Sequence, residues 1–405
     1  MTGAASVRIV VVGGGVVGLA AAFKLLQGRV SSDVVVLEKE QQVGQHQTGH
    51  NSGVLHTGLY YRPGSAKARL AVAGIREMTA FCQEHGVAHE ICGKLVLAAD
   101  ESEQAGLEAL ADRGRQNGLV GLELLSAERI REIEPHAGGV AALRVPEAGL
   151  VDYRKVAAVL AGLVVRSGGR VVTCARVREV RRDRQGSWIV ETTAGEFEAG
   201  YLVTCAGLHA DRMLRLTGDS NPVRIIPFRG EYYRLRPERE DLVRHLIYPV
   251  PDLRFPFLGV HFTRMIGGGV EAGPNAVLAL AREGYTASRI NLRDMAEALT
   301  FPGLWRFVAR NRAATVAELR RSFSRSRFAA SLQRLVPEVS ARDLVPGGAG
   351  VRAQAMRPDG TLVDDFCFVE GRGVLHVLNA PSPAATASLA IGGEIAGRVR
   401  LRLPI

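Results

Sequence analysis

The sequence predicts an α/β protein, α+β overall, in which a domain with an antiparallel sheet is inserted into a domain with a parallel sheet. Three observations support this fold class. A β-branched run at 7–12 is followed at once by a glycine-rich turn and a helical segment, and a second such run ends at residue 37. Strand-like segments with alternating apolar residues lie between 223 and 272, and Gly267-Gly268-Gly269 is expected to form the hairpin turn between Phe257–Met265 and Val270–Ala272. The chain of 405 residues is long enough for two domains with separate cores.

The first 39 residues carry the pattern of a dinucleotide-binding βαβ unit. Val7–Val12 suits a buried parallel strand, and a helix is expected over Leu19–Leu26. In the G-x-G-x-x-G spacing, the first glycine permits a tight turn and the second lets backbone N–H groups approach a pyrophosphate. The third glycine lets the helix pack closely on the strand. The residues expected to contact the cofactor here are Gly13, Gly14, Gly15, Val16, Val17 and Gly18.

An acidic residue follows the second strand in the register that this unit requires. The strand is expected over Asp33–Leu37, and Glu38 lies 20 residues after Gly18. A carboxylate at this place can accept hydrogen bonds from the ribose hydroxyls of adenosine, and Lys39 is expected beside the same moiety. A signal peptide is disfavoured, because no basic segment precedes Val7 and no A-x-A cleavage site follows the apolar run.

Composition restricts the partners and the compartment. The net charge of +10 comes from arginine, since the chain has only five lysines, and it favours acidic partners such as carboxylates, phosphates or anionic lipid. Nucleic acid is not expected, because no binding module or dense basic tail is visible. Five cysteines without a C-x-x-C pair indicate a reducing compartment, and hence a cytoplasmic protein.

The segment 306–334 is the most basic part of the chain. It has eight arginines and a single acidic residue, Glu318, interleaved with aromatic and aliphatic side chains. Such a helical hairpin could lie on an anionic bilayer, at the inner face of a membrane. A solvated helical surface with its apolar side in the core explains the pattern equally simply and is slightly favoured.

A polar loop over Gln45–Tyr61 follows the second strand. It is dense in histidine, tyrosine and small polar residues, which is unusual for a linker and places it near the cofactor. His46 and His50 have the spacing of zinc ligands on a helix, but the intervening Thr48-Gly49 indicates a loop. No metal site is therefore expected.

From this loop onward the chain resembles the FAD-dependent oxidoreductases of the D-amino-acid oxidase superfamily, and within them the enzymes that oxidise L-2-hydroxyglutarate. The resemblance covers nearly the whole chain and is weakest over 288–334. The motifs that carry it are HQTGHNSGVLHTGLYY (46–61), CGKLVLA (92–98), GLVDYR (149–154), CAGLHAD (205–211), IPFRGEYYRLRPE (226–238), LIYPVPD (246–252), FPFLGVHFT (255–263), GPNAVLAL (273–280), GVRAQAMRPDG (350–360) and LHVLNAPSPAATASLAIG (375–392).

The resemblance implies a discontinuous FAD-binding domain made of 1–80, 146–220 and 341–405, with a substrate domain made of 81–145 and 221–340. Strands are expected over Arg170–Val180 and Tyr201–Ala206, and a helix aimed at the flavin is expected to start near Ala384, after Pro381 and Pro383. The further residues expected to bind FAD are Thr48, Gly49, His50, Asn51, Ser52, Val177, Ala206, Gly207, Ala384, Ala385 and Thr386.

Oxidation of a 2-hydroxy acid requires a carboxylate anchor, a proton acceptor and a nearby hydride acceptor, the flavin N5. Arg352 resembles the carboxylate-binding arginine of the superfamily, and its guanidinium can grip a carboxylate with two hydrogen bonds. His261, in an expected strand over Phe257–Thr263, is favoured as the base over His56. The unranked candidates for a second carboxylate are Tyr61, Tyr232, Tyr233 and Arg264.

Two other function classes stay open. An amine or amino-acid oxidase of the same superfamily would share the fold and Arg352, but is expected to lack the HQTGHNSG and NAPSPAATAS motifs. A non-catalytic flavin-binding protein would not need His56, His261 and Arg352 together. The electron acceptor, oxygen or a membrane quinone, and the oligomeric state are not fixed by the sequence.

Overall fold

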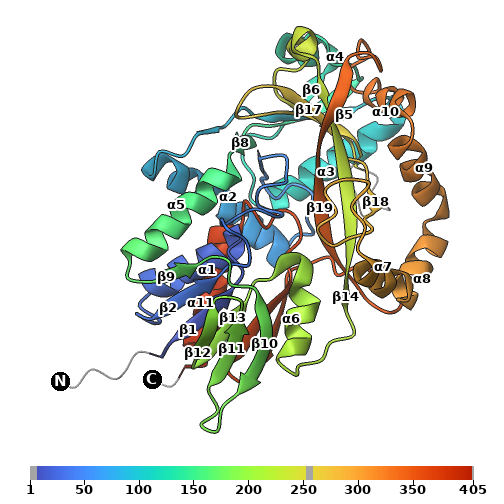
Figure 1. Ribbon diagram of the computed structural model, residues 1–405. Helices are drawn as coiled ribbons and strands as arrows, with labels where there is room; N and C mark the ends of the chain where they lie inside the picture. The colour runs from blue at the N-terminus through green and yellow to red at the C-terminus, as the bar shows by residue number, and fades with distance from the viewer. Residues whose placement is uncertain (1–6, 252–258, 404–405) are drawn as a thin grey trace.

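The computed structural model describes residues 7–251 and 259–403 and contains two large sheets (Figure 1). The first is a six-stranded sheet in which five strands run parallel and one edge strand, β20, is antiparallel. Its order along the sheet is β20 (Cys367–Gly371), β21 (Val374–Asn379), β13 (Tyr201–Thr204), β1 (Ile9–Val12), β2 (Val34–Leu37) and β9 (Arg170–Val172).

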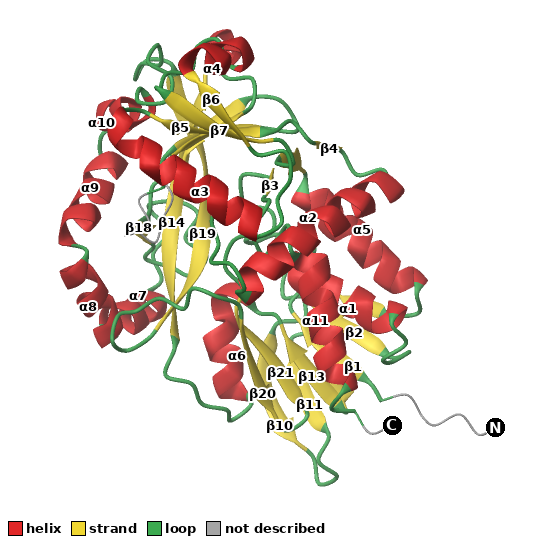
Figure 2. Ribbon diagram, turned by 180° about the vertical axis from the view of Figure 1, so that it is seen from behind, coloured by secondary structure: helices red, strands yellow, loops and turns green. Residues whose placement is uncertain are grey.

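Both faces of this sheet are covered, which explains why its strands are continuously apolar. Alternate residues of β1, such as Ile9 and Val11, pack on a helical layer, while Val10 and Val12 pack on a three-stranded sheet and on Met213. The helices of the first layer are α1 (Val16–Gln27), α2 (Ala66–Glu84), α5 (Tyr153–Arg166) and α11 (Ser388–Arg400), as Figure 2 shows. The three-stranded sheet consists of β10 (Val177–Arg182), β11 (Trp188–Thr192) and β12 (Gly195–Ala199), and Met213 belongs to α6 (Ala210–Leu216).

The second large sheet has nine strands and is mostly antiparallel. Its longest pair, β14 with β19, runs from this sheet toward the six-stranded sheet (Figure 1). The order is β18 (Val277–Leu278), β14 (Arg224–Leu235), β17 (Val270–Gly273), β16 (His261–Arg264), β15 (Leu246–Pro249), β5 (Lys94–Ala98), β7 (Ala141–Val145) and β6 (Glu123–Ser126), with β19 (Leu344–Met356) also paired to β14.

Helices and short elements complete the fold around this sheet. The helices α3 (Gln104–Gln116), α4 (Ala127–Ile133) and α10 (Arg325–Leu332) pack on it through two apolar clusters. A small sheet of β3 (Val54–Leu55), β8 (Gly149–Val151) and β4 (His89–Glu90) lies between the larger ones. The remaining helical elements are α7 (Leu292–Leu299), α8 (Pro302–Arg310), α9 (Arg312–Ser322) and the 3₁₀ turns at Glu101–Glu103, Gly207–His209 and Pro237–Leu242.

The predicted mixed α/β class is confirmed, as are the first βαβ unit and the hairpin at 267–269. In that hairpin Thr263 pairs with Glu271, and Gly268 and Gly269 both have positive φ. Of the strand expected over Phe257–Thr263, residues 257 and 258 lie outside the described residues.

Two expected elements differ from the structure. The strand expected over Arg170–Val180 is divided between two sheets, because Cys174 adopts a positive φ of 54° and the chain turns there. The helix expected near Ala384 begins at Ser388. Residues 381–387 instead form turns, in which the Ala384 amide donates to the Pro381 carbonyl and the Ala387 amide to the Pro383 carbonyl.

The domain boundaries remain a prediction, with one observation bearing on them. The segment 341–405, expected in the FAD domain, contributes β20, β21 and α11 to the six-stranded sheet and its helical layer. It also contributes β19 to the nine-stranded sheet, where β19 pairs with β14 along almost its whole length. This segment therefore links the two sheets.

Candidate active site

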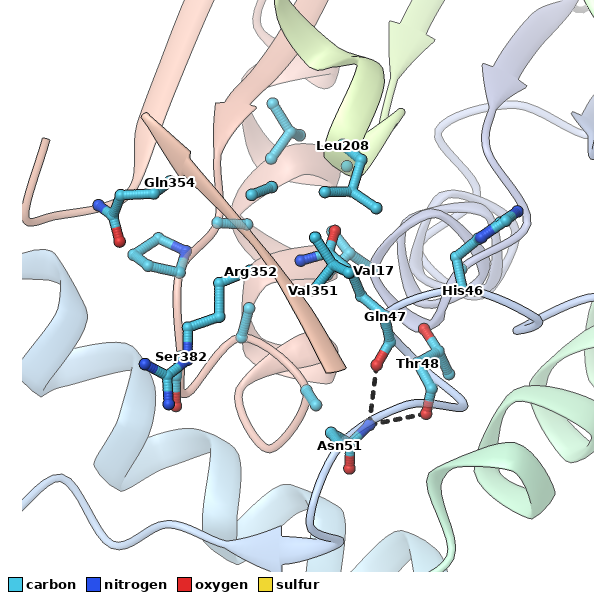
Figure 3. A pocket seen from close by; sticks show the side chains of 18 of the residues that line it. Val17, His46, Gln47, Thr48, Asn51, Leu208, Val351, Arg352, Gln354 and Ser382 are labelled. Atoms are coloured by element: carbon cyan, nitrogen blue, oxygen red, sulfur yellow. Dashed lines mark hydrogen bonds between the residues drawn. The ribbon is translucent and has the colours of Figure 1, made fainter. Parts of the chain in front are cut away.

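A cavity of about 1610 Å³ lies between the two large sheets. It is larger than the roughly 300–1,000 Å³ of most small-molecule pockets, so a dinucleotide and a substrate can share it. Figure 3 shows side chains from the glycine-rich unit, the polar loop, β19 and the turn after β21 converging on it, including Val17, Thr48, Arg352 and Ser382.

The glycine-rich unit forms one end of this cavity. The Gly14 amide donates to Oε2 of Glu38 (2.8 Å) and the Glu40 amide donates to Oε1 (2.9 Å), which fixes the carboxylate at the end of β2. Gly13 has φ +112°, and a Cβ there would come within 2.3 Å of the Cys205 carbonyl oxygen. A side chain is therefore excluded at Gly13 by the protein's own backbone.

Gly15 is different, and it provides the test of whether this cavity fits a dinucleotide. Gly15 has an ordinary φ of −76°, and a Cβ there would contact only the Thr48 hydroxyl at 3.4 Å. The protein itself leaves room for a side chain at this position, yet the position opens on the cavity at the N-terminus of α1. Helix N-termini favour phosphate groups, so the residues present fit the pyrophosphate of a dinucleotide.

The polar loop lies against the same helix end. The Val16 amide donates to Oγ1 of Thr48 (3.0 Å). Nδ2 of Asn51 donates to the carbonyls of Gln47 (3.0 Å) and Thr48 (2.7 Å), the two bonds drawn in Figure 3. Asn51 thus stabilises the loop as well as lining the cavity. The other predicted cofactor residues that line the cavity are Gly18, Glu38, Lys39, His50, Ser52, Val177, Ala206, Gly207, Ala384, Ala385 and Thr386.

Gly14 and Gly49 are predicted cofactor residues that do not line the cavity. The Gly14 amide is used by Glu38, as described above. The Gly49 carbonyl accepts two hydrogen bonds from the guanidinium of Arg154 (3.0 and 2.7 Å), and a Cβ on Gly49 would meet the Gly44 carbonyl oxygen at 2.7 Å. Gly14 and Gly49 therefore stabilise the backbone at the glycine-rich end of the cavity without lining it.

His261 lies in the wall formed by the nine-stranded sheet. Its Nδ1 is 2.8 Å from the Gly259 carbonyl, so Nδ1 carries the hydrogen and Nε2 is the acceptor in the neutral ring. The ring stacks on Tyr248 with centroids 3.9 Å apart, and His261 is only 5% exposed. Burial, together with the positive charges of Arg352 and Lys94, lowers the pKa of His261 to about 3.

His56 faces the same cavity from the polar loop. Its backbone amide donates to Oγ1 of Thr386 (3.1 Å), and its Nδ1 has no hydrogen-bond partner among the described residues. Burial, and then the charge of Lys94, lowers the pKa of His56 to about 3. Both histidines are therefore neutral bases at pH 7, and neither titrates near neutrality as an unperturbed imidazole would.

Arg352 lies on β19, opposite Phe228 of β14, and lines the cavity. Its charge lowers the pKa of His261, and it opposes the effect of burial on the pKa of Tyr232, which burial raises to about 12. Arg352 thus lies within electrostatic reach of both His261 and Tyr232. A cation, a neutral base and a protonated phenol in one cavity can bind a carboxylate and accept a proton from a neighbouring hydroxyl.

The predicted substrate residues separate into two groups. Tyr61 and Tyr232 line the cavity. Arg264 does not, because its guanidinium pairs with the carboxylate of Glu90. Tyr233 packs edge-on against Phe328, with ring centroids 4.8 Å apart. Of the four candidates for the second substrate carboxylate, Tyr61 and Tyr232 therefore line the cavity in the structure, and Arg264 and Tyr233 do not.

The sequence interpretation missed Lys94, Tyr60 and Tyr248. Lys94 is 2% exposed, and its Nζ lies 4.6 Å from the Tyr60 ring centroid and 5.0 Å from that of Tyr248. Burial lowers the pKa of Lys94 to about 7. The sequence feature that could have indicated Lys94 is a single lysine at the start of the apolar strand KLVLA, in a chain with few lysines.

A cluster of charged groups closes the cavity near the polar loop. Lys39 Nζ lies 2.7 Å from Oε1 of Glu283 and 2.6 Å from Nε2 of His46, and it also pairs with Glu40. His46, Glu40 and Glu283 have the spacing of metal ligands. The lysine ammonium already occupies the space between them, so the cluster is an ion-pair network.

Residues 8–398 match the family described as FAD dependent oxidoreductase, almost the entire chain. This chain belongs to that family of FAD-dependent oxidoreductases. It is 47% identical over 389 residues to "L-2-hydroxyglutarate dehydrogenase" of Indibacter alkaliphilus, covering 96% of this chain and 97% of that protein. It is 43% identical over 416 residues to the human "L-2-hydroxyglutarate dehydrogenase, mitochondrial", covering 99% and 90%.

A solved structure agrees with this assignment at the level of the fold. The L-alpha-glycerophosphate oxidase from Mycoplasma pneumoniae, solved with FAD bound, aligns with a TM-score of 0.79 at 21% identity, covering 98% of this chain and 97% of that one. As a member of the family of FAD-dependent oxidoreductases, the chain is an enzyme that uses FAD. Among the described residues, no helix is both long enough and apolar enough to span a bilayer.

Proposed function

We propose that this flavoenzyme oxidises L-2-hydroxyglutarate to 2-oxoglutarate. The observation that carries the proposal is that Arg352, His261 and Tyr232 line the same cavity as the glycine-rich unit, with Arg352 acting on both of the others. The relatives named L-2-hydroxyglutarate dehydrogenase, 42–47% identical over nearly the full chain, support the substrate.

Each residue has a defined part in this reaction. The Arg352 guanidinium holds the C1 carboxylate with two hydrogen bonds, and the Tyr232 hydroxyl, kept protonated by burial, donates to the same end of the substrate. Nε2 of His261 accepts the proton of the C2 hydroxyl. Bound FAD supplies the acceptor for the hydride and its two electrons from C2. The buried wall excludes water, which strengthens these interactions.

His261 is the better candidate for the base because its ring is oriented. The hydrogen bond from Nδ1 to Gly259 and the stacking on Tyr248 fix both its tautomer and its plane. The His56 imidazole has no such anchor, since its Nδ1 lacks a partner among the described residues. His56 is proposed to contact the substrate without taking its proton.

We also propose that the reduced enzyme passes its electrons to a quinone at a membrane surface. Helices α7–α9 lie along one side of the molecule (Figure 1). The segment 292–323 exposes Leu292, Trp305 and Phe323, the last with 87% of its surface accessible. The arginines of 306–334 flank these side chains. Part of the segment packs inward, because Phe307, Phe328 and Leu332 are buried. Exposed aromatic residues among arginines suit an anionic bilayer.

Two experiments test these proposals. Steady-state turnover with an artificial electron acceptor, with the product identified by mass spectrometry, should yield 2-oxoglutarate from L-2-hydroxyglutarate. Turnover of glycine or sarcosine with no turnover of L-2-hydroxyglutarate would show an amine oxidase instead. For the membrane, the protein should sediment with vesicles of anionic lipid and not with zwitterionic vesicles. Sedimentation with neither, and rapid reoxidation by oxygen, would exclude the quinone route.

A further inference from the structure

The wall that contains Lys94 holds a buried positive charge without a negative partner. The only cause that moves the pKa of Lys94 is its own burial, so no carboxylate of the described residues lies near enough to stabilise the ammonium. A buried cation without a counter-ion costs several kcal/mol and is rarely retained without a role. The two tyrosine rings that contact Lys94 compensate this cost only in part.

Several polar atoms around Lys94 also lack hydrogen-bond partners. The hydroxyl of Tyr60 is buried without a hydrogen-bond partner among the described residues, and the buried hydroxyls of Tyr248 and Thr263 interact with each other without a hydrogen bond of normal geometry. Tyr248 and Thr263 are each 1% exposed. Buried hydroxyls are nearly always paired in folded proteins, so a cluster of orphaned hydroxyls beside an orphaned ammonium indicates a missing acceptor.

The charges that act on the two neighbouring histidines have a single sign. Burial is the largest cause that lowers the pKa of His56 and of His261; the charges that lower it further are Lys94, His261 and Lys67 for His56, and Arg352 and Lys94 for His261. No acidic side chain contributes to either shift. An anion is the acceptor that suits these charges, and Tyr60, Tyr248, His56 and His261 all line the cavity from which it would come. Lys94 does not line the cavity itself, but its Nζ lies 4.6 Å and 5.0 Å from the ring centroids of Tyr60 and Tyr248, which do.

We propose that Lys94, with the hydroxyls of Tyr60 and Tyr248, forms the subsite for the distal carboxylate of a dicarboxylic 2-hydroxy acid. The inference rests on the proposed function, since it places the C1 carboxylate at Arg352. His261 lies within electrostatic reach of both Arg352 and Lys94. The carboxylate carbons of an extended five-carbon diacid lie roughly 5 Å apart, so one substrate can bridge two cations that both act on the same base.

This arrangement explains specificity as well as binding. A monocarboxylic 2-hydroxy acid would place an apolar chain end against Lys94 and leave the ammonium and both hydroxyls unpaired. Sites with buried polar groups reject substrates that cannot pair them far more strongly than apolar pockets reject a wrong shape. Lys94 is thus the specificity-determining residue, while Arg352 and His261 serve any 2-hydroxy acid.

The test compares two substrates that differ only at the distal end. Lys94→Met keeps the length of the side chain and removes the charge. With L-2-hydroxyglutarate, kcat/KM should fall by about 100-fold, whereas with L-2-hydroxypentanoate it should stay within about threefold of wild type or rise. Tyr60→Phe should lower kcat/KM for L-2-hydroxyglutarate, relative to kcat/KM for L-2-hydroxypentanoate, by about tenfold. The matched control is Lys155→Met, an exposed lysine on α5, which should leave both values unchanged.

A binding measurement keeps the inference independent of turnover. Glutarate and butyrate are titrated into the FAD-loaded protein, following the visible flavin spectrum and the melting temperature. Wild type should bind glutarate at least tenfold more tightly than butyrate, and Lys94→Met should lose this preference while remaining folded. The subsite would be overturned if Lys94→Met lowered kcat/KM equally for both hydroxy acids. It would also be overturned if Lys94→Met kept the wild-type preference for glutarate over butyrate. If wild type prefers glutarate yet fails to oxidise L-2-hydroxyglutarate, only the proposed function is wrong.

Discussion

Replacing His261 with asparagine is expected to slow flavin reduction by about 10²–10⁴-fold, the usual cost of removing a general base. This corresponds to about 3–5 kcal/mol of transition-state stabilisation. The substitution is chosen because the asparagine Nδ2 takes the place of Nδ1 and can still donate to the Gly259 carbonyl, which is 2.8 Å from Nδ1 in the structure. The Nε2 acceptor alone is then lost, and FAD should remain bound.

The pH dependence follows from the buried position of the ring. With a pKa of about 3, only about one His261 ring in 10⁴ is protonated at pH 7, so the base is available throughout the physiological range. The acid limb assigned to His261 should therefore lie well below pH 6, and flavin reduction should show no histidine limb between about pH 6 and pH 8. An ionisation seen near pH 7 in kcat/KM is assigned to Lys94, and it should vanish in Lys94→Met.

Anaerobic stopped-flow mixing with L-2-hydroxyglutarate, followed by the loss of visible flavin absorbance, measures this step directly. His56→Asn is the matched control and should retain FAD with a smaller loss of rate. The reasoning is refuted if His261→Asn reduces its flavin at the wild-type rate, or if His56→Asn is the slower variant. A wild-type limb near pH 6.5 that disappears with His261→Asn would show that the ring is less buried in the complex than in the structure.

The remaining predictions concern the cofactor, the anchor and stability. Gly15→Val should fold normally but purify without yellow colour, because its side chain clears the protein and enters the pyrophosphate site; Gly18→Ala, whose Cβ would lie 2.0 Å from the Gly13 carbonyl oxygen, should destabilise the fold itself. Full FAD occupancy in Gly15→Val would contradict the placement of the pyrophosphate at Gly15. Arg352→Lys should lower kcat/KM by an amount that corresponds to about 2–4 kcal/mol of transition-state stabilisation, because an ammonium cannot make the two parallel hydrogen bonds of a guanidinium. An unchanged kcat/KM would exclude Arg352 as the group that binds the C1 carboxylate. Because burial lowers the folded-state pKa of His261 from 6.5 to about 3, the unfolded chain binds a proton in this window that the folded chain does not. The free energy of unfolding should therefore fall below pH 6.5, by about 2 kcal/mol at pH 5 from this ring, and chemical denaturation of His261→Asn should show a weaker acid dependence.

Features set by neighbouring residues were predictable from the sequence. The unit from β1 to Glu38 follows from glycine spacing and β-branched runs, and the hairpin between β16 and β17 follows from Gly267–Gly269. The break at Cys174 was not predictable, because a positive φ at a non-glycine residue leaves no mark in composition. Pro381 and Pro383 suggested a helix start, but the turns they make delay α11 to Ser388.

Site residues that belong to a local sequence motif were predictable. Site residues whose role depends on contacts between distant segments were not. His261, His56 and Arg352 came from local motifs, and the structure brings all three to one cavity. The ion pair of Arg264 was not predictable, because its partner, Glu90, is 174 residues away. Lys94 was missed for the same reason, since its significance depends on Tyr60 and Tyr248 meeting it from distant segments.

The most direct test of the account is anaerobic mixing of the FAD-loaded enzyme with the two enantiomers of 2-hydroxyglutarate. Three fixed groups, Arg352, His261 and Lys94, hold the L-enantiomer in one orientation, so only this enantiomer should bleach the flavin and yield 2-oxoglutarate. The D-enantiomer, glycine and sarcosine should leave the visible spectrum unchanged over the same time. Equal bleaching by both enantiomers, or bleaching by an amine and not by L-2-hydroxyglutarate, would contradict the proposed function.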